Sequence, residues 1–251
     1  MPVETAVVIL DWKLPDLTKK TLDSVKTTMN INNISVVLVE QETTDTGSEE
    51  LVKDFPNYSP IFNKENVGVP KGLNQGIEKS LTWKPRYIFF LNNDIELLPG
   101  VYDKLKKCIE SNPRIGIVGG RAIPYNPPNP LPIHGTVVFL NGEFHPLKID
   151  VPSGTPDLDI DMETYSVGMA CSLVRVEMIK DIGMFDEIYN PCTYEDTDFC
   201  FRARSKGWKV MVSNSAKYYH VGGATFMTKG NFTQFFDRNR EIFVSRWKEM
   251  L

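Results

Sequence analysis

The sequence lacks the features that mark zinc-binding, disulfide-rich and membrane-spanning proteins. It has only four cysteines, and none are paired at the short spacing of a zinc site. A chain of 251 residues can bury a core without a disulfide framework, so reduced thiols and a cytoplasmic setting are expected. No segment has the length of a membrane helix, and the first residues lack the features of a signal peptide. We therefore expect any membrane-bound partner to be contacted peripherally, from the aqueous side.

Positive charge is also scarce. The net charge is −4, and no lysine- or arginine-rich run is present. This argues against a general nucleic-acid binder and against attraction to an anionic membrane surface. With 41% hydrophobic and 24% charged residues, the composition is that of an ordinary globular protein. Any nucleotide is therefore expected to bind in a specific pocket.

Short apolar runs alternate with helical patterns in the first half of the chain. Four runs have the composition of strands buried on both faces: 6–10, 35–39, 87–91 and 115–118. Three intervening segments are predicted helices: 14–28, 70–80 and 104–111. This alternation predicts an α/β fold, a sandwich with a mainly parallel central sheet. Ligands of such sheets bind beyond the carboxyl ends of the strands, which makes Asp11, Glu40 and Asp94 the first candidates.

The pattern changes after residue 120. Six prolines fall between Pro124 and Pro146, and a long irregular stretch inside a domain is often a functional loop. Residues 136–140, followed by Asn141-Gly142, predict a hairpin, since Asn-Gly suits a tight turn. Regular structure is then expected in four segments: 168–174, a helix at 195–206, a short strand at 210–212 and a helix at 232–247.

Carboxylates gather at two places. Asp94 follows a buried apolar run, where it either ligates a divalent metal beside a pyrophosphate or simply begins a polar loop. Glu195, Asp196 and Asp198 stand at the start of the helix predicted at 195–206. There the helix dipole stabilises acids, and Asp198 can pair with Arg202 four residues on. A carboxylate kept ionised at this place is also what a general base requires, so both uses stay open.

A histidine and a series of glycines are further candidates. His220 precedes two glycines, which leave room for a metal or phosphate, although a single histidine is often structural. Gly68, Gly72 and Gly76 recur every four residues, so on a helix they would share one face. Such a face admits either a ligand or close packing on the sheet. The spacing is neither the dinucleotide fingerprint nor the P-loop.

Together and in this order, these segments resemble the family 2 glycosyltransferases, which have the GT-A fold. The resemblance runs from about residue 6 to 247 and rests on AVVILDWK, VVLVEQETTD, ENVGVPKGLNQG, FFLNNDIEL, IGMFDEIYNPCTYEDTDFCFRARSKGW, YYHVGGAT and FFDRNREIFVSRW. It implies a single Rossmann-like GT-A domain over 1–251, with a smaller acceptor-side β region. Residues 1–120 would bind the nucleotide sugar, and 121–251 the acceptor. Within the family the chain is most similar to rhamnosyltransferases and related polysaccharide-building enzymes.

The resemblance also implies a donor site. Glu40 would accept the imide N–H of a uracil or thymine base, so that a UDP- or dTDP-linked sugar is the expected donor. Asp45 would be a second acid of the nucleotide pocket. Asp94 and His220 would hold a divalent metal, Mn²⁺ or Mg²⁺, which neutralises charge on the departing nucleoside diphosphate. The remaining predicted donor-site residues are Asp11, Asn66, Gly68, Gly72, Asn74 and Asn93.

The catalytic residues implied by the resemblance are Asp196 and its neighbour Glu195. Asp196 would take the proton from a hydroxyl of a glycan or glycoconjugate acceptor as that hydroxyl attacks the anomeric carbon. A single displacement of this kind inverts the anomeric configuration. Two positions depart from the family pattern. Asn92-Asn93-Asp94 keeps only the last acid of Asp-x-Asp, and Glu40 is one methylene longer than the commoner aspartate.

Two other functions fit parts of the pattern. A nucleotidyltransferase combines a similar sheet with an acidic metal site and would release pyrophosphate from a nucleoside triphosphate. The acid pair followed by a late histidine argues against it. A catalytically silent nucleotide-sugar-binding module would bind without turnover, and the intact acids at positions 94, 195 and 196 argue against that.

Overall fold

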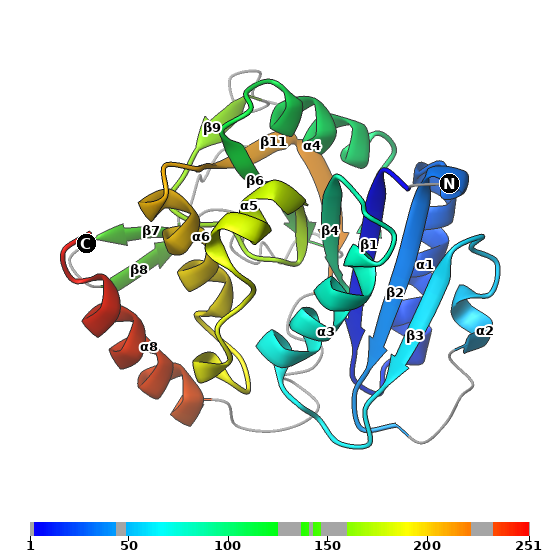
Figure 1. Cartoon of the computed structure of the whole chain (residues 1–251), viewed down its shortest axis with the longest axis horizontal. Helices are drawn as coiled ribbons and strands as arrows, with labels where there is room; N and C mark the ends of the chain where they lie inside the picture. Colours follow the sequence, from blue (N-terminus) through cyan, green and yellow to red (C-terminus); the bar gives the residue numbers. More distant parts are fainter. Residues whose placement is uncertain are drawn as a thin grey trace.

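The computed structural model describes residues 3–43, 49–124, 137–140, 143–146, 160–221 and 233–250. A nine-stranded sheet lies at its centre, in the order β3-β2-β1-β4-β10-β6-β11-β5, with β9 paired to β11 (Figure 1). Its strands are β1 (Thr5–Asp11), β2 (Ile34–Glu40), β3 (Tyr58–Phe62), β4 (Tyr87–Asn92), β5 (Ile95–Leu97), β6 (Ile115–Pro124), β9 (Asp161–Glu163), β10 (Cys171–Arg175) and β11 (Lys209–His220).

Six strands of this sheet point the same way. β1 is parallel to β2 and β4, β2 to β3, and β6 to β11. β10 lies between β4 and β6 and is antiparallel to both, so β6 and β11 keep the direction of β4. Only β5, β9 and β10 run the opposite way among the described strands of this sheet. The predicted, mainly parallel α/β sheet is thereby confirmed.

Helices cover both faces of the sheet. On one face, α1 (Pro15–Thr28) and α4 (Val101–Glu110) contribute apolar side chains to a core shared with β1, β2 and β4. On the other face, α3 (Val69–Leu81), α5 (Val176–Ile182) and α6 (Glu195–Ser205) enclose a second core. The result is the three-layered sandwich that the alternating pattern predicts.

The helix α8 (Thr233–Trp247) lies outside these layers, against α6 (Figure 1). Buried rings of Tyr189, Tyr194, Phe201 and Phe243 form a small aromatic core between them. Phe201 and Phe243 meet edge to face at 5.0 Å, a favoured geometry for aromatic pairs. α8 therefore has a core of its own, which fixes it beside the start of α6.

The second half contains both a confirmed prediction and a correction. β7 (Val137–Leu140) and β8 (Glu143–Pro146) form a separate antiparallel pair, the hairpin predicted around residues 141–142, which themselves lie outside the described residues. The predicted short strand at 210–212 is wrong in length, since β11 extends to residue 220. The register of β11 against β6 shifts between residues 213 and 217, and polar Ser213 and Asn214 are buried there, which hid the strand's continuation.

Some short elements were not predicted. β3 lies at the edge of the sheet and contains Pro60, which is tolerated at an edge because no ladder partner needs its amide. The remaining ones are α2 (Glu49–Val52), α5, β5, β9 and two 3₁₀ helices, η1 (Ile31–Asn33) and η3 (Glu187–Tyr189), none longer than seven residues.

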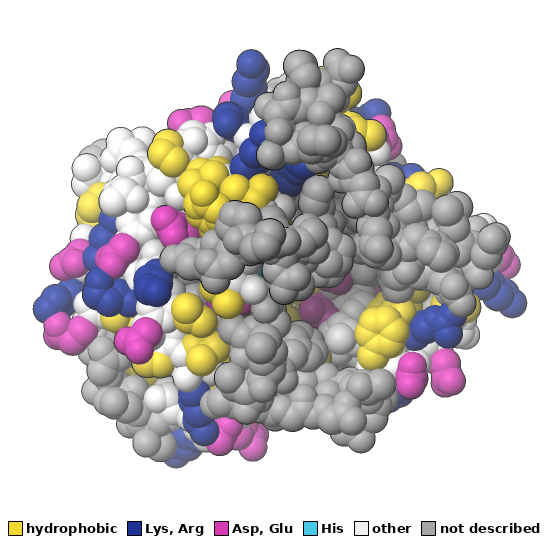
Figure 2. All heavy atoms as spheres, turned by 180° about the vertical axis from the view of Figure 1, so that it is seen from behind, with side chains coloured by type: hydrophobic (Ala, Val, Ile, Leu, Met, Phe, Trp, Pro, Cys, Tyr) yellow, Lys and Arg dark blue, Asp and Glu magenta, His cyan; other side chains and the backbone are white. Residues whose placement is uncertain are grey.

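Positively and negatively charged side chains are mixed on the described surface, as the balanced composition predicts. Figure 2 shows lysine and arginine side chains interspersed with aspartate and glutamate over the coloured part of one face. No helix within the described part of the chain has the length and apolar character needed to cross a bilayer.

Candidate active site

The candidate residues that follow strands meet at one edge of the sheet, as the parallel order predicts. Asp11 ends β1 opposite Glu40 at the end of β2, and Leu10 lies opposite Asn92 at the end of β4. A cavity of about 330 Å³ lies at this edge. Five of the predicted site residues line it: Asn66, Asn93, Asp94, Glu195 and Asp196.

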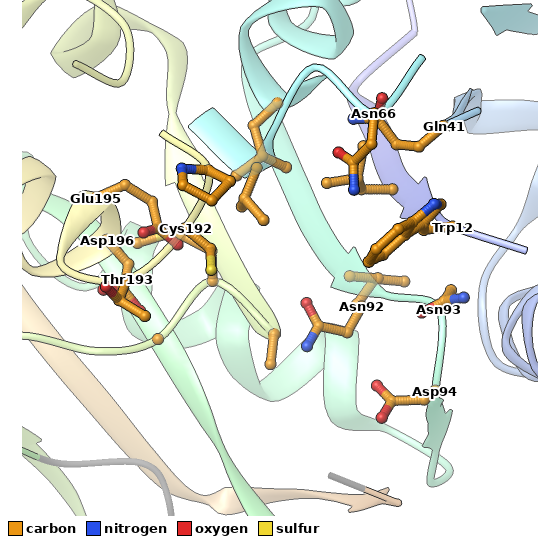
Figure 3. A pocket seen from close by; sticks show the side chains of 18 residues that line it. Trp12, Gln41, Asn66, Asn92, Asn93, Asp94, Cys192, Thr193, Glu195 and Asp196 are labelled. Atoms are coloured by element: carbon orange, nitrogen blue, oxygen red, sulfur yellow. The ribbon is translucent and has the colours of Figure 1, made fainter. Parts of the chain in front are cut away.

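The lining residues approach the cavity from two sides. Figure 3 shows Glu195 and Asp196 on one side and Trp12, Gln41 and Asn66 on the other. Asn93 and Asp94, in the turn after β4, lie on the side away from the acid pair, and Asn92 lies between the two sides (Figure 3). The cavity therefore separates the acids of α6 from the ends of the parallel strands.

Asp11 is buried and organises one wall of the cavity. Its carboxylate accepts hydrogen bonds from the Thr18 hydroxyl at 2.8 Å and the Leu14 amide at 3.3 Å, at the start of α1. It also accepts a hydrogen bond from the side-chain amide of Asn93, which lines the cavity. Asp11 is not among the lining residues. Its hydrogen bond instead holds the side chain of Asn93 in place at the cavity.

The start of α3 is held against the end of β2. The Gln41 side chain accepts a hydrogen bond from the Val67 amide at 3.1 Å and donates one to the Gly68 carbonyl at 3.3 Å. The Asn66 side chain accepts a hydrogen bond from the Gly68 amide at 2.9 Å. Gly68 has φ +89°, a conformation that favours glycine. These bonds fix Asn66 and Gln41 at the cavity wall.

The glycine series packs α3 on the sheet. A Cβ on Gly72 would lie 2.6 Å from atoms of both Leu10 and Gln41, and one on Gly76 would collide with Val8. Gly72 therefore touches the sheet and is not among the residues that line the cavity. Of the two uses that the spacing left open, close packing is the one observed.

Two more predicted residues lie outside the lining of the cavity. The Asn74 side chain donates to the Phe185 carbonyl and accepts from the Phe185 amide, both at 2.9 Å, which joins α3 to the segment after α5. Glu40 is buried at the end of β2, where its carbonyl accepts a hydrogen bond from the Asn63 amide at 2.9 Å. Neither residue is among those that line the cavity. Asp45 lies outside the described residues.

Asp94 and His220 form a pair because β5 and β11 are neighbours. β5 begins directly after Asp94, and its first residue, Ile95, lies opposite His220 at the end of β11. Asp94 Oδ1 is 3.1 Å from His220 Nε2. The same ring nitrogen is 3.5 Å from Nδ2 of the Asn92 side chain. Within the described residues, no group of three or more His, Cys, Asp or Glu could hold a metal. A metal here would take two protein ligands and leave its other positions to phosphate oxygens or water.

Glu195 and Asp196 open α6 at the cavity. Glu195 is 9% exposed, and its Oε2 has no hydrogen-bond partner among the described residues. Asp196 Oδ1 accepts hydrogen bonds from the Thr197 amide at 2.6 Å and the Thr197 hydroxyl at 3.2 Å. Burial raises the pKa of both carboxyls, and the charge of Asp196 raises that of Glu195 further. A carboxylate with a raised pKa is a stronger proton acceptor, which suits a general base.

The third acid of this segment has a structural use. Asp198 is fully buried, and its carboxylate accepts hydrogen bonds at 2.9 Å from Arg202, Arg246 and Trp247. The pair with Arg202 is the one that helical spacing predicts. Because Arg246 and Trp247 belong to α8, Asp198 joins α6 to α8.

Trp12 and Gln41 line the cavity without standing out in the sequence. The Trp12 indole donates a hydrogen bond to the Glu42 carboxylate at 2.9 Å, which ties the ring to the segment after β2. Each of the two residues directly follows a candidate at a strand end, Asp11 or Glu40. The rule that selects strand ends would find them if it were extended by one residue.

The described lining of the cavity is acidic. It contains the carboxylates of Asp94, Glu195 and Asp196 but no lysine, arginine or histidine. A divalent cation bound at this wall would screen these carboxylates from a negatively charged ligand.

Two solved structures have the same fold as this chain. The crystal structure of GalNAc-T7 with UDP, GalNAc and Mn²⁺ has a TM-score of 0.68 and 14% identity, over 87% of this chain and 44% of that one. S. aureus TarS 1–349 has a TM-score of 0.60 and 16% identity, over 89% of this chain and 62% of that one. Similarity at this level of identity concerns the fold alone, and it confirms the GT-A fold.

The family follows from the sequence comparison. The sequence model of the protein family described as glycosyl transferase family 2 matches residues 13–183 of the chain. The chain belongs to glycosyl transferase family 2, which confirms that prediction.

Two curated relatives are each 25% identical to the chain. One is N-acetylglucosaminyl-diphospho-decaprenol L-rhamnosyltransferase of Mycobacterium tuberculosis (strain ATCC 25618 / H37Rv), similar over 205 residues, 74% of this chain and 66% of the relative. The other is the O-antigen biosynthesis protein RfbC of Myxococcus xanthus, similar over 219 residues, 84% of this chain and 17% of the relative. The chain thus spans less than two thirds of the length of either relative.

Proposed function

We propose that the protein is an inverting glycosyltransferase that moves a sugar from a nucleoside-diphosphate sugar to a hydroxyl of a glycan or glycoconjugate. The observation that carries the proposal is the arrangement of one cavity. Asp94, which is hydrogen-bonded to His220, lies on one side, and the buried acid pair Glu195–Asp196 lies on the other. A donor diphosphate and an acceptor hydroxyl need these two kinds of group on opposite sides of the transferred sugar.

The donor would enter at the ends of β1 and β2. Trp12 offers an aromatic face beside Asn66, where a nucleobase can stack. Glu40 ends β2 but lies outside the described lining of the cavity, so its proposed contact with the imide of uracil or thymine rests on the resemblance alone. UDP- and dTDP-linked sugars are therefore the proposed donors.

A divalent metal suits the residues on the donor side. Asp94 supplies a hard carboxylate oxygen and His220 an imidazole nitrogen, 3.1 Å apart in an otherwise acidic site. When bound, Mn²⁺ or Mg²⁺ would neutralise charge on the diphosphate. The single carboxylate of Asn92-Asn93-Asp94 leaves more of the coordination to phosphate oxygens than two acids would.

Asp196 would act as the general base. As the acceptor oxygen forms its bond to the anomeric carbon, its proton passes to the Asp196 carboxylate. The bond from the anomeric carbon to the diphosphate oxygen breaks, and its electron pair leaves with the nucleoside diphosphate. This single displacement inverts the anomeric configuration. Because Asp196 Oδ1 is occupied by Thr197, Oδ2 is the atom proposed to receive the proton.

The relatives suggest where such an activity belongs. One is named for rhamnosyl transfer to a lipid-linked sugar and the other for O-antigen biosynthesis. We propose that this protein also builds a polysaccharide or glycolipid, and that it meets a membrane-bound acceptor peripherally. A cytoplasmic location stays a prediction from the sequence.

Calorimetric titration with UDP, dTDP and GDP, each with and without Mn²⁺, tests the donor side. Metal-dependent binding of UDP or dTDP supports the proposal. Absence of binding by all three nucleotides contradicts it. Binding without transfer to any acceptor would instead favour a catalytically silent nucleotide-sugar-binding module.

A further inference from the structure

The segment before α6 is held by one side chain of α8. Asn239 is fully buried, and its amide nitrogen lies 2.8 Å from the carbonyl oxygens of Tyr189 and Cys192 and 3.1 Å from that of Thr193. The two amide protons are thus shared among three carbonyls of one loop. Cys192 and Thr193 line the cavity, and the acid pair follows them after one residue, Tyr194.

The backbone of this loop is in a conformation that needs support. Thr193 has φ +78° and Tyr194 has φ +68°, and neither is a glycine. Left-handed backbone is strained in such residues, above all in the β-branched Thr193. It persists only where surrounding contacts over-determine it, and such strain clusters at functional sites. Here it sets the direction in which the chain enters α6.

The neighbouring side chain fixes the orientation of the amide. Arg238 donates a hydrogen bond from Nε to Asn239 Oδ1 at 2.9 Å. Its guanidinium also donates to the carbonyls of Ile188 at 2.8 Å and Asn190 at 2.6 Å. The carbonyl oxygen of the Asn239 amide is therefore engaged, and its nitrogen is left facing the loop.

We propose that Asn239 is a positioning residue for the transfer reaction, which holds the strained loop so that Asp196 presents its carboxylate to the cavity. The proposal rests on the proposed function, in which Asp196 is the base. Asn239 does not line the cavity and acts through the loop carbonyls. A displacement of about 1 Å at a reacting group can lower a rate by about 100-fold, so even a modest relaxation of the loop would be measurable.

The test compares Asn239→Ala and Asn239→Asp with Arg175→Ala in the full chain. Arg175 also donates to two backbone carbonyls, those of Ile109 and Ile115, but at the opposite edge of the sheet, where it lies across from Tyr87 at the start of β4. Its loss removes similar hydrogen bonds without touching the loop. Hydrogen exchange of the peptide spanning 188–197, the nucleotide dissociation constant, and kcat against pH are measured for each variant.

We expect both Asn239 variants to lower kcat by about 10- to 100-fold while nucleotide binding changes less than about twofold. Their 188–197 peptide should exchange faster than in the wild type. The acid limb of the kcat profile should move to lower pH, since a loosened loop admits water to Asp196. Arg175→Ala should change none of these.

Two results would overturn the inference: an unchanged kcat and pH profile in Asn239→Ala, or an equal loss of kcat in Arg175→Ala. A wild type that transfers no sugar to any acceptor would instead refute the proposed function. In that case faster exchange confined to the Asn239 variants still establishes the loop support, so the two failures remain distinguishable.

Discussion

Replacing Gly68 by alanine should destabilise the protein in two separable ways. With φ +89° and ψ 165°, the residue occupies a region that is almost restricted to glycine, and holding alanine there costs about 1–3 kcal/mol. The new Cβ would also lie 2.5 Å from Asn190 Oδ1 and 3.1 Å from the Pro191 Cα. Overpacking of this kind costs roughly 1–3 kcal/mol, because the Pro191 contact is with backbone that cannot rotate away. The expected loss is therefore about 2–6 kcal/mol.

Gly100→Ala provides the matched control. Gly100 also has positive φ, at +79°, but a Cβ there would meet nothing within 4 Å, so only backbone strain of about 1–2 kcal/mol is added. For a chain of this size, each kcal/mol of lost stability lowers the midpoint of thermal unfolding, Tm, by about 2–4 °C. The Tm should therefore fall by about 4–24 °C for Gly68→Ala and by about 2–8 °C for Gly100→Ala. Equal losses in the two variants would refute the argument that α3 is packed closely against Asn190 and Pro191.

Three further outcomes are expected at the cavity. Asp196→Asn should lower transfer by about 100-fold or more while leaving nucleotide binding by calorimetry nearly intact, whereas equal loss of both would make Asp196 structural. His220→Ala should weaken UDP or dTDP binding in the presence of Mn²⁺ but not in its absence, and an unchanged metal dependence would remove His220 from the metal site. Because burial raises the Glu195 pKa, the folded wild type loses stability as pH rises above the ordinary carboxyl value of about 4.3. Glu195→Gln should therefore gain stability over the wild type in urea titrations as the pH rises from 5 to 8, and a constant difference would contradict this.

The parallel half of the fold could be predicted because its sequence signals are local. The buried runs of β1, β2 and β4 are continuous apolar segments, and the helices between them have amphipathic spacing. Once the strands are taken as parallel, the candidate residues at their ends must meet at one edge. That is why Asp94 could be placed at the cavity without a structure, whereas Asp11 and Glu40, selected by the same rule, lie outside the described lining.

The remaining parts of the site depend on contacts between distant segments. The Asp94–His220 pair depends on the pairing of β5 with β11, and the spacing along the chain does not encode that pairing. The two glycines after His220 made it a candidate, and the resemblance gave it the role of a metal ligand. Gly72 and Asn74 stand in a motif whose polar and small residues serve packing, and sequence alone could not separate this use from ligand binding. Asn239 carries no local signal, since its partners lie about fifty positions earlier.

The hold that α8 exerts on the loop before α6 bears on the order in which the chain is made. α8 is the last helix that the structure describes, so it leaves the ribosome after the sheet and the acid pair have been synthesised. Until α8 docks, the carbonyls of residues 189, 192 and 193 lack the side-chain amide of Asn239 as a hydrogen-bond donor. The left-handed backbone before Glu195 is then without that support. A nascent chain that stops short of α8 would then assemble the nucleotide side of the cavity while the proposed base, Asp196, is not yet in place. Such a chain would bind the proposed donor before it could use it.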